Sequence, residues 1–284
     1  MKHIVCFVLT AVLVFGLIAC GQTAPAVTTA PGTAAATETA TEPAPTETEP
    51  VETEPAPTET EPVETEPAPT EPEHSELFLP EVSQKDMIAY FNEAVLDTEY
   101  STGDGDPSLV QKWVDPIYYR VTGNPTEEDL VILEALFGQL NEIEGFPGFF
   151  PADETRPTED LTISFLDENT FNIAFSDFLR GEIADGAVQY WYYTDSNIIH
   201  SARIGYRTDI GQDIRNSVLL EEVVNGLGFN DTALRSDSIV YQYGSDATAL
   251  SDVDWLLLKL LYHPDIQCGM NADQCREILE KLYY

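Results

Sequence analysis

The stretch QDIRNSVLLEEVVNGLGFND, residues 212–231, predicts a helix that ends in a tight turn. Its apolar residues recur at helical spacing: Leu220, Val223, Val224 and Leu227. Gly228 stands where a left-handed helix terminus is favoured, so the chain can turn back and bring Asp231 toward the helix. Glu221 and Asn225 are four residues apart and therefore project from one side of the helix.

The order Glu221-Glu222-x-x-Asn225-x-x-Gly228-x-x-Asp231 resembles the extended zinc-peptidase motif, His-Glu-x-x-His-x-x-Gly-x-x-His/Asp. In that motif two histidines hold the metal and the glutamate acts as general base. Glu221 and Asn225 stand in place of the histidines, so zinc is not expected. The resemblance makes Glu222 the candidate catalytic base. It makes Glu221, Asn225 and Asp231 candidate ligands of a harder cation such as calcium, magnesium or manganese.

Other segments resemble domain of unknown function family 2927, a family of exported bacterial domains. The segments that carry this resemblance are residues 112–117, 221–231, 238–239, 250–254, 261–264 and 269–270. The resemblance covers most of residues 85–284 and implies a zincin-like fold with an altered metal motif, without naming a reaction. Residues 238–243 and 250–254 are also similar to the tight turn and helix that follow the motif in metzincin peptidases. The turn methionine is absent, and Val240 stands nearest to its place.

The remaining pattern predicts an α+β domain over residues 77–284, with a mixed or antiparallel sheet, the motif-bearing helix and C-terminal helices. Helices are expected over 86–96, 126–144, 212–227, 251–262 and 271–282. Strands are expected over 117–122, 161–166 and 171–175, followed by a hairpin of 187–194 and 198–206. His200 falls on the apolar face of the second hairpin strand and is expected to be a packed core histidine.

Residues 1–20 predict a signal peptide, because Lys2 precedes an apolar run that is too short to span a membrane. The run ends in Leu-Ile-Ala-Cys-Gly, which resembles a bacterial lipobox with Cys20 as the lipidated residue. The alternative is an ordinary signal peptide with an incidental cysteine. The lipobox predicts an exported protein, anchored through lipid (palmitate among its acyl chains) to the outer face of the bacterial membrane.

Residues 21–76 contain almost only Ala, Thr, Pro, Glu and Val, and repeat a twelve-residue unit from position 42 onward. Proline and like charge favour an extended, disordered tether over a packed structure. The chain carries 50 acidic and 13 basic residues, a net charge of −37. Residues 1–75 hold 12 of the acids and 1 of the bases, which leaves 38 acids, 12 bases and a net −26 for the rest. This charge argues against nucleic-acid partners and against adhesion to anionic lipid heads.

Cys268 and Cys275 are the cysteines that remain beyond the lipobox, and in an exported protein they predict a disulfide. A metal site at this pair is disfavoured because no second thiol pair or histidine completes it. The sequence contains no nucleophile elbow, P-loop or dinucleotide fingerprint, so no cofactor is expected beyond a hard divalent cation.

Three hypotheses of function follow. The favoured one is a non-catalytic, zincin-like domain that binds a cell-wall or extracellular peptide or protein partner, or maintains the envelope. The second is a metal-dependent, peptidase-like hydrolase with Glu222 as base. The third is a plain spacer or solute-binding lipoprotein, in which Glu221 and Glu222 are only a solvated helix face.

Overall fold

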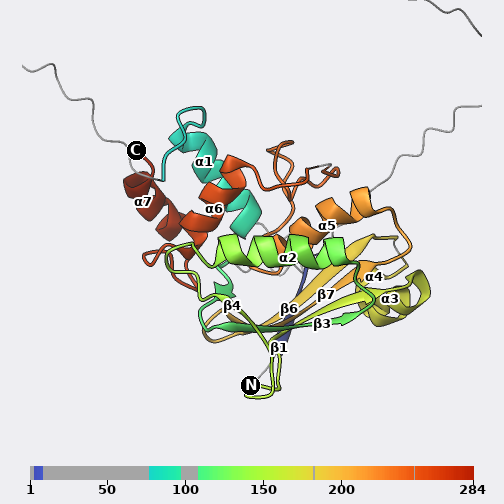
Figure 1. Ribbon diagram of the computed structural model, residues 1–284. Coiled ribbons are helices and arrows are strands. Elements are labelled where there is room, and N and C mark those ends of the chain that lie inside the picture. Colours follow the sequence, from blue (N-terminus) through green and yellow to red (C-terminus); the bar gives the residue numbers. More distant parts are fainter. Residues whose placement is uncertain (1–2, 9–76, 97–107, 182, 246) are drawn as a thin grey trace, which may run out of the picture. The chain divides into compact units, whose positions relative to one another are not determined.

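The computed structural model describes residues 3–8, 77–96, 108–181, 183–245 and 247–284, and these belong to one compact unit (Figure 1). The predicted tether, Cys20 and most of the predicted signal peptide lie outside the described residues. Over the described part of the chain, no helix is long and apolar enough to cross a membrane.

The centre of the fold is a seven-stranded mixed sheet. Its strand order is β1 (His3–Val8), β6 (Gly186–Tyr193), β7 (Ile198–Arg207), β5 (Leu161–Leu166), β3 (Ile117–Gly123) and β4 (Phe149–Pro151), with the short β2 (Lys112–Trp113) paired to β7. Four pairings are parallel, and the two pairings that involve β6 are antiparallel. The sheet is therefore mixed, as the sequence predicted, but it is mostly parallel and not antiparallel. Parallel neighbours need crossover connections, and the helices between β3 and β4 and between β5 and β6 lie in such connections.

The helices are α1 (Gln84–Phe91), α2 (Glu127–Leu140), α3 (Glu168–Ala174), α4 (Ser176–Leu179), α5 (Gln212–Asn225), α6 (Asp252–Tyr262) and α7 (Ala272–Leu282), with a π-helical turn η1 (Asn92–Leu96) after α1. The predicted helices are confirmed within a few residues. Thr126, Ser251 and Asn271 cap α2, α6 and α7 through reciprocal capping boxes.

The strand predicted over residues 171–175 is wrong, because this segment lies in and at the end of α3. Asp167 accepts a hydrogen bond from the backbone N–H of Thr170 and starts the helix. Phe171 and Phe175 are one helical turn apart, and their buried rings stack with centroids 5.1 Å apart. Aromatic residues favour strands on average, but the four-residue spacing of Phe171 and Phe175 places both rings on one side of the helix, in a small apolar cluster.

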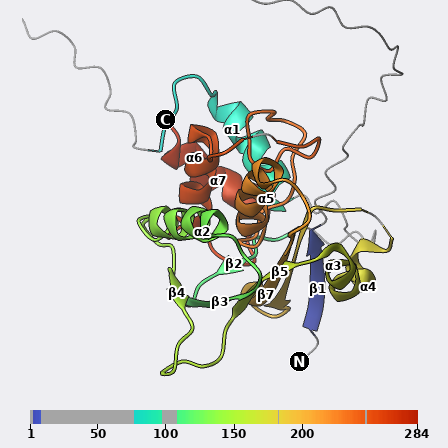
Figure 2. The same cartoon turned by 45° about the vertical axis from the view of Figure 1, so that its right-hand side comes forward.

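Helices α2 and α5 lie across one face of the sheet, and α1, α6 and α7 gather on the same side beyond α5 (Figures 1 and 2). Helices α3 and α4 lie beside the strands, where a side chain at Gly205 of β7 would meet the ring of Phe175 at 2.3 Å. The main core lies between the sheet and α5, whose residues from Ser217 to Asn225 are all buried. This packing places the predicted site inside the domain.

Candidate functional site

The two motif glutamates are buried, although adjacent acidic residues on a helix usually face water. Glu221 is 2% exposed and Glu222 is fully buried, because α5 packs against the sheet and against neighbouring segments along its whole second half. The hypothesis that this pair is a solvated helix face is therefore wrong. The pair belongs to the core.

The turn after α5 brings Asp231 back to the helix, as the motif spacing predicted. Gly228 adopts a φ of +107°, and a Cβ at this position would lie 2.1 Å from the carbonyl oxygen of Gln111. Only glycine accommodates both conditions. Beyond the turn, the side-chain amide of Asn225 donates a hydrogen bond of 3.0 Å to Oδ1 of Asp231.

Burial favours the protonated form of the carboxyl group at Glu221. Desolvation raises the pKa of Glu221 well above its usual value of 4.5, and the nearby negative charges of Asp231 and Glu222 raise it further. Oε1 of Glu221 has no hydrogen-bond partner among the described residues. The pKa of Tyr206 is also raised by burial and by the charges of Glu222, Asp129 and Glu221. The acidic side chains of Glu221, Glu222 and Asp231 therefore lie close enough to repel one another, in a part of the domain where burial weakens solvent screening.

Glu222 lies against the first residue of β6. A Cβ at Gly186 would come within 2.9 Å of Oε1 of Glu222 and within 2.4 Å of Cγ1 of Val218. The glycine thus makes room for the glutamate between α5 and the sheet. A general base must come within hydrogen-bond reach of its proton, and Glu222 has no exposed surface from which to do so in this conformation.

No metal cluster accompanies these carboxylates: over the described ranges, no three His, Cys, Asp or Glu side chains are grouped to hold an ion. The groups that the motif brings together are Asn225 and Asp231, which bond to each other, and Glu221, whose pKa is raised by the charge of Asp231 as well as by burial. Their oxygens would suit a hard cation rather than zinc.

The tight turn around Ser238 is held by α6. The hydroxyl of Ser238 donates 2.6 Å to Oδ1 of Asp254, and the N–H of Ile239 donates 3.1 Å to Oδ2. Tyr90 of α1 donates to the Ser238 hydroxyl at 2.6 Å, which the sequence did not suggest. Val240, the residue nearest to the turn methionine, is buried beside this network.

His200 and His263 make contacts with residues outside the motif. His200 is only half-buried and stacks on the exposed Tyr193 with ring centroids 4.3 Å apart, so the prediction of a packed core histidine is not confirmed. His263 accepts a hydrogen bond at Nδ1 from the backbone N–H of Asp265 in the turn after α6.

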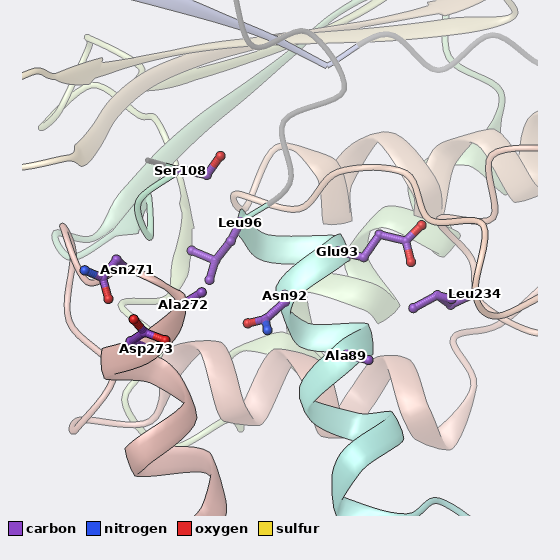
Figure 3. Close-up of a pocket in the computed structure, with 9 residues that line it drawn as sticks. All are labelled: Ala89, Asn92, Glu93, Leu96, Ser108, Leu234, Asn271, Ala272 and Asp273. Carbon is purple, nitrogen blue, oxygen red and sulfur yellow. The ribbon is translucent and has the colours of Figure 1, made fainter. Parts of the chain in front are cut away.

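A depression of about 610 Å³ lies elsewhere on the domain (Figure 3). It is lined by Ala89, Asn92, Glu93, Leu96, Ser108, Leu234, Asn271, Ala272 and Asp273. Figure 3 shows the Asn92 side chain between α1 and the start of α7. Both lining carboxylates are engaged: Glu93 accepts a hydrogen bond from the N–H of Ala233, and Asp273 pairs with Arg276. None of the motif residues reaches this surface.

Cys268 and Cys275 are free thiols in this structure, so the predicted disulfide stays a prediction. The Cys268 thiol lies 3.6 Å from the carbonyl oxygen of Lys112. Burial raises the pKa of both thiols, that of Cys275 to about 11, while the ammonium of Lys112 opposes the rise in each. Both sulfurs are therefore within electrostatic reach of one lysine.

Comparison with known proteins gives one match. No curated protein and no solved structure matches the chain. Residues 84–281 match the family model described as "Protein of unknown function (DUF2927)", which covers well over half of the 284 residues and all the motif positions. The chain therefore belongs to this DUF2927 family.

Proposed function

We propose that this protein is an exported, lipid-anchored surface protein whose DUF2927 domain is a zincin-like scaffold without peptidase activity, used for binding at the envelope. The observation that carries the proposal is the complete burial of Glu222, the residue in the place of the catalytic base. A second observation agrees with it, because amide and carboxylate groups replace both helix histidines of the zinc motif.

The zincin-like assignment rests on the local arrangement around α5. The helix ends at a glycine turn that returns Asp231 to Asn225, and a tight turn around Ser238 is tied to the helix α6 that follows. These are the relations that the resemblance to the extended zinc motif implies. The fold would then keep the helix and turns that surround the metal in zinc peptidases, while the motif carboxylates are packed in the core and bind no metal.

A metal-dependent hydrolase is the second candidate, and one observation favours it. Oε1 of Glu221 is buried without a partner among the described residues, beside Asp231, and such an atom gains free energy from a cation. Glu221, Asn225 and Asp231 would hold a hard divalent ion, which would polarise a bound water or carbonyl group. Glu222 would then take up a proton from the attacking water once the site opened.

One experiment separates the two candidates. The processed chain is analysed for metal content and titrated calorimetrically with zinc, calcium and manganese, and its hydrolysis of peptides and cell-wall fragments is measured. We expect the wild type to bind no metal stoichiometrically. We also expect that any hydrolysis it shows is unchanged in Glu222→Gln. Glu277→Gln, an exposed change on α7, is the matched control. Tight binding lost in Asp231→Ala, or turnover lost in Glu222→Gln alone, would establish the hydrolase.

The proposed anchor has its own test. Cells that express the full chain are fed an alkyne-labelled fatty acid, and the protein is examined for label and for its intact mass. Label is expected in the wild type and in Cys6→Ser, which alters only the predicted signal peptide, and should be lost in Cys20→Ser. Equal labelling of the two variants would refute lipidation at Cys20.

A further inference from the structure

One face of the sheet lies opposite the long helices, since α2 and α5 lie across the other face (Figures 1 and 2). Burial alternates along β5: residues 161, 163 and 165 belong to the main core, whereas residues 162, 164 and 166 are half-buried on the opposite side. The ring of Phe175, at the end of α3, covers this side at Gly205 of β7. Side chains on the rest of this side form what we call the open face, which consists of Trp191, Arg203, Thr162, Arg120, Tyr118 and Phe150.

Aromatic side chains stand at both ends of the open face. At one end Trp191 of β6 pairs with Ser201 of β7. At the other end Tyr118 of β3 pairs with Phe150 of β4, and their ring centroids lie 5.9 Å apart. The registers of β7, β5 and β3 place Ser201 and Tyr118 at the same level of the sheet. Trp191 and Tyr118 are therefore three strand spacings apart, roughly 14 Å, and a linear ligand laid across the strands meets a ring at each end.

An arginine lies between these ends, one level further along the strands. The guanidinium of Arg203 lies 4.8 Å from the ring centroid of Phe175 and 5.9 Å from that of Trp191, and its Nε donates a hydrogen bond of 2.6 Å to Oε1 of Gln189. The charge of Asp177 acts on it, but Arg203 forms no ion pair with any residue that the structure describes. A half-buried guanidinium in this state can donate to a carboxylate of a ligand.

Two more arginines border the Tyr118 end of the open face. Arg156 stacks over the Tyr118 ring, 4.1 Å from its centroid, and pairs with Asp160 at 3.3 Å. Arg120 pairs with Glu159 at 3.2 Å. The side chains of Arg120 and Arg156 are 39% and 47% exposed, so these ion pairs are weak and can be exchanged for a ligand at little cost. The open face thus gathers three arginines in a domain of net charge −26, which otherwise repels anions.

We propose that the open face binds a linear glycan that carries carboxylate groups, with sugar rings packed on Trp191 and Phe150 and a carboxylate held by Arg203. Pyranose rings present apolar C–H faces to aromatic rings, and their hydroxyl groups can bond to a side chain such as Thr162. An extended polypeptide fits less well, because the backbone groups within a sheet are directed at neighbouring strands and not at its face. The inference rests on the exported location in the proposed function and names the partner class that this function leaves open.

The test uses the full chain and the chain from residue 20 with Cys20→Ser, because the open face comes from residues 118–203 and should bind in either form. The probe is a linear oligosaccharide of alternating N-acetylglucosamine and N-acetylmuramic acid without peptide stems, and an N-acetylglucosamine oligomer of equal length is its neutral counterpart. A synthetic peptide of residues 42–65 presents carboxylates on a polypeptide. In calorimetry at constant ionic strength, the carboxylated glycan should bind about tenfold more tightly than the neutral one, and the peptide more weakly than both.

The role of the charge is tested with a matched pair of arginine variants. Arg203→Met keeps an apolar stem beside Phe175 and removes the guanidinium, so it should lose the tenfold preference for the carboxylated glycan. Arg276→Met removes an exposed arginine from α7, on the helical side of the sheet (Figure 1), and should leave both affinities unchanged. Urea unfolding of each variant shows whether a change in binding accompanies a change in stability.

Two aromatic variants locate the bound ligand. Trp191→Phe keeps a ring on the open face, so it should still bind the glycan, but the ligand-induced change in tryptophan fluorescence should disappear. Trp113 is buried and Trp255 lies on α6, so neither tryptophan belongs to the open face. Phe150→Ala removes a ring that is 43% exposed on a short edge strand, and it should weaken the binding of both glycans.

Several outcomes would overturn the proposal: equal affinity for the carboxylated and neutral glycans, an unchanged preference in Arg203→Met, or a fluorescence change of equal size in Trp191→Phe. Tighter binding of the peptide would overturn it as well and would assign the open face to an acidic polypeptide. Absence of glycan binding sinks the proposal alone, because metal content and hydrolysis decide the proposed function. Loss of the predicted lipid label would remove the anchored location without changing the glycan result.

Discussion

Replacing Glu221 with glutamine should flatten the dependence of the domain's stability on pH. The folded-state pKa of Glu221 is raised above its unfolded value, first by burial and then by the charges of Asp231 and Glu222. The stabilisation from this group is therefore fully present below about pH 4.5 and is lost as pH rises through the folded pKa. The folded domain holds a proton in this interval that the unfolded chain has released.

The linkage relation gives the magnitude. One proton held by the folded state alone lowers the free energy of unfolding by about 1.4 kcal/mol for each pH unit. Over two pH units within the interval, the wild type should lose roughly 3 kcal/mol from this group. Glu221→Gln keeps the shape of the side chain and cannot ionise. It should therefore lack this slope, and it should exceed the wild type in stability at the alkaline end.

The assay is urea unfolding followed by tryptophan fluorescence from pH 5 to pH 8, with a chelator present. All three tryptophans lie in the domain, so one signal reports its unfolding. Glu277→Gln, which alters an exposed carboxylate, should give a profile parallel to the wild type. Parallel profiles for the wild type and Glu221→Gln would refute the reasoning. They would mean that Glu221 is ionised in the folded protein, with its charge compensated, and would favour the cation-binding alternative.

Two further predictions concern packing and covalent structure. Gly186→Ala places a methyl group 2.4 Å from Val218 and 2.9 Å from Glu222, so we expect the free energy of unfolding, measured with urea, to fall by about 1–3 kcal/mol. The control is Gly138→Ala on α2, where the added methyl group meets nothing within 4 Å and should raise that free energy by up to about 1 kcal/mol. Similar effects at both positions would contradict the close approach of Glu222 to β6. Alkylation of the exported protein, denatured but not reduced, should find neither Cys268 nor Cys275 as a free thiol, and reduction should cost roughly 2 kcal/mol because the bridged loop is short; two free thiols per chain would disprove the disulfide.

Local signals in the sequence were sufficient for most of the elements. The capping residues of α2, α6 and α7 mark their starts through side-chain bonds made within four residues. The hairpin of β6 and β7 was predictable because its strands are neighbours in the chain. The strand predicted over residues 171–175 is wrong, because phenylalanine favours strands on average, whereas the packing of Phe171 and Phe175 against Gly205 of β7 is a long-range contact.

The sequence predicted which motif residues come together around α5, but it did not predict that the two glutamates are buried. Motif spacing brought Asp231 to Asn225, since a helix and one glycine turn determine that approach. The same spacing gave no indication that Glu221 and Glu222 would be buried, because burial depends on packing around α5. The support of the Ser238 turn by Tyr90 was also beyond local reasoning, since these residues are 148 positions apart.

By itself, the sequence determined the resemblance to a family that the comparison confirmed, the positions of most helices and strands, and the turn at Gly228, because these depend on interactions between near neighbours. Only the tertiary structure decided that the sheet is mostly parallel and that the motif glutamates lie in the core with a raised pKa at Glu221. These properties arise from burial and strand pairing between distant segments, where desolvation and backbone hydrogen bonding outweigh local preference.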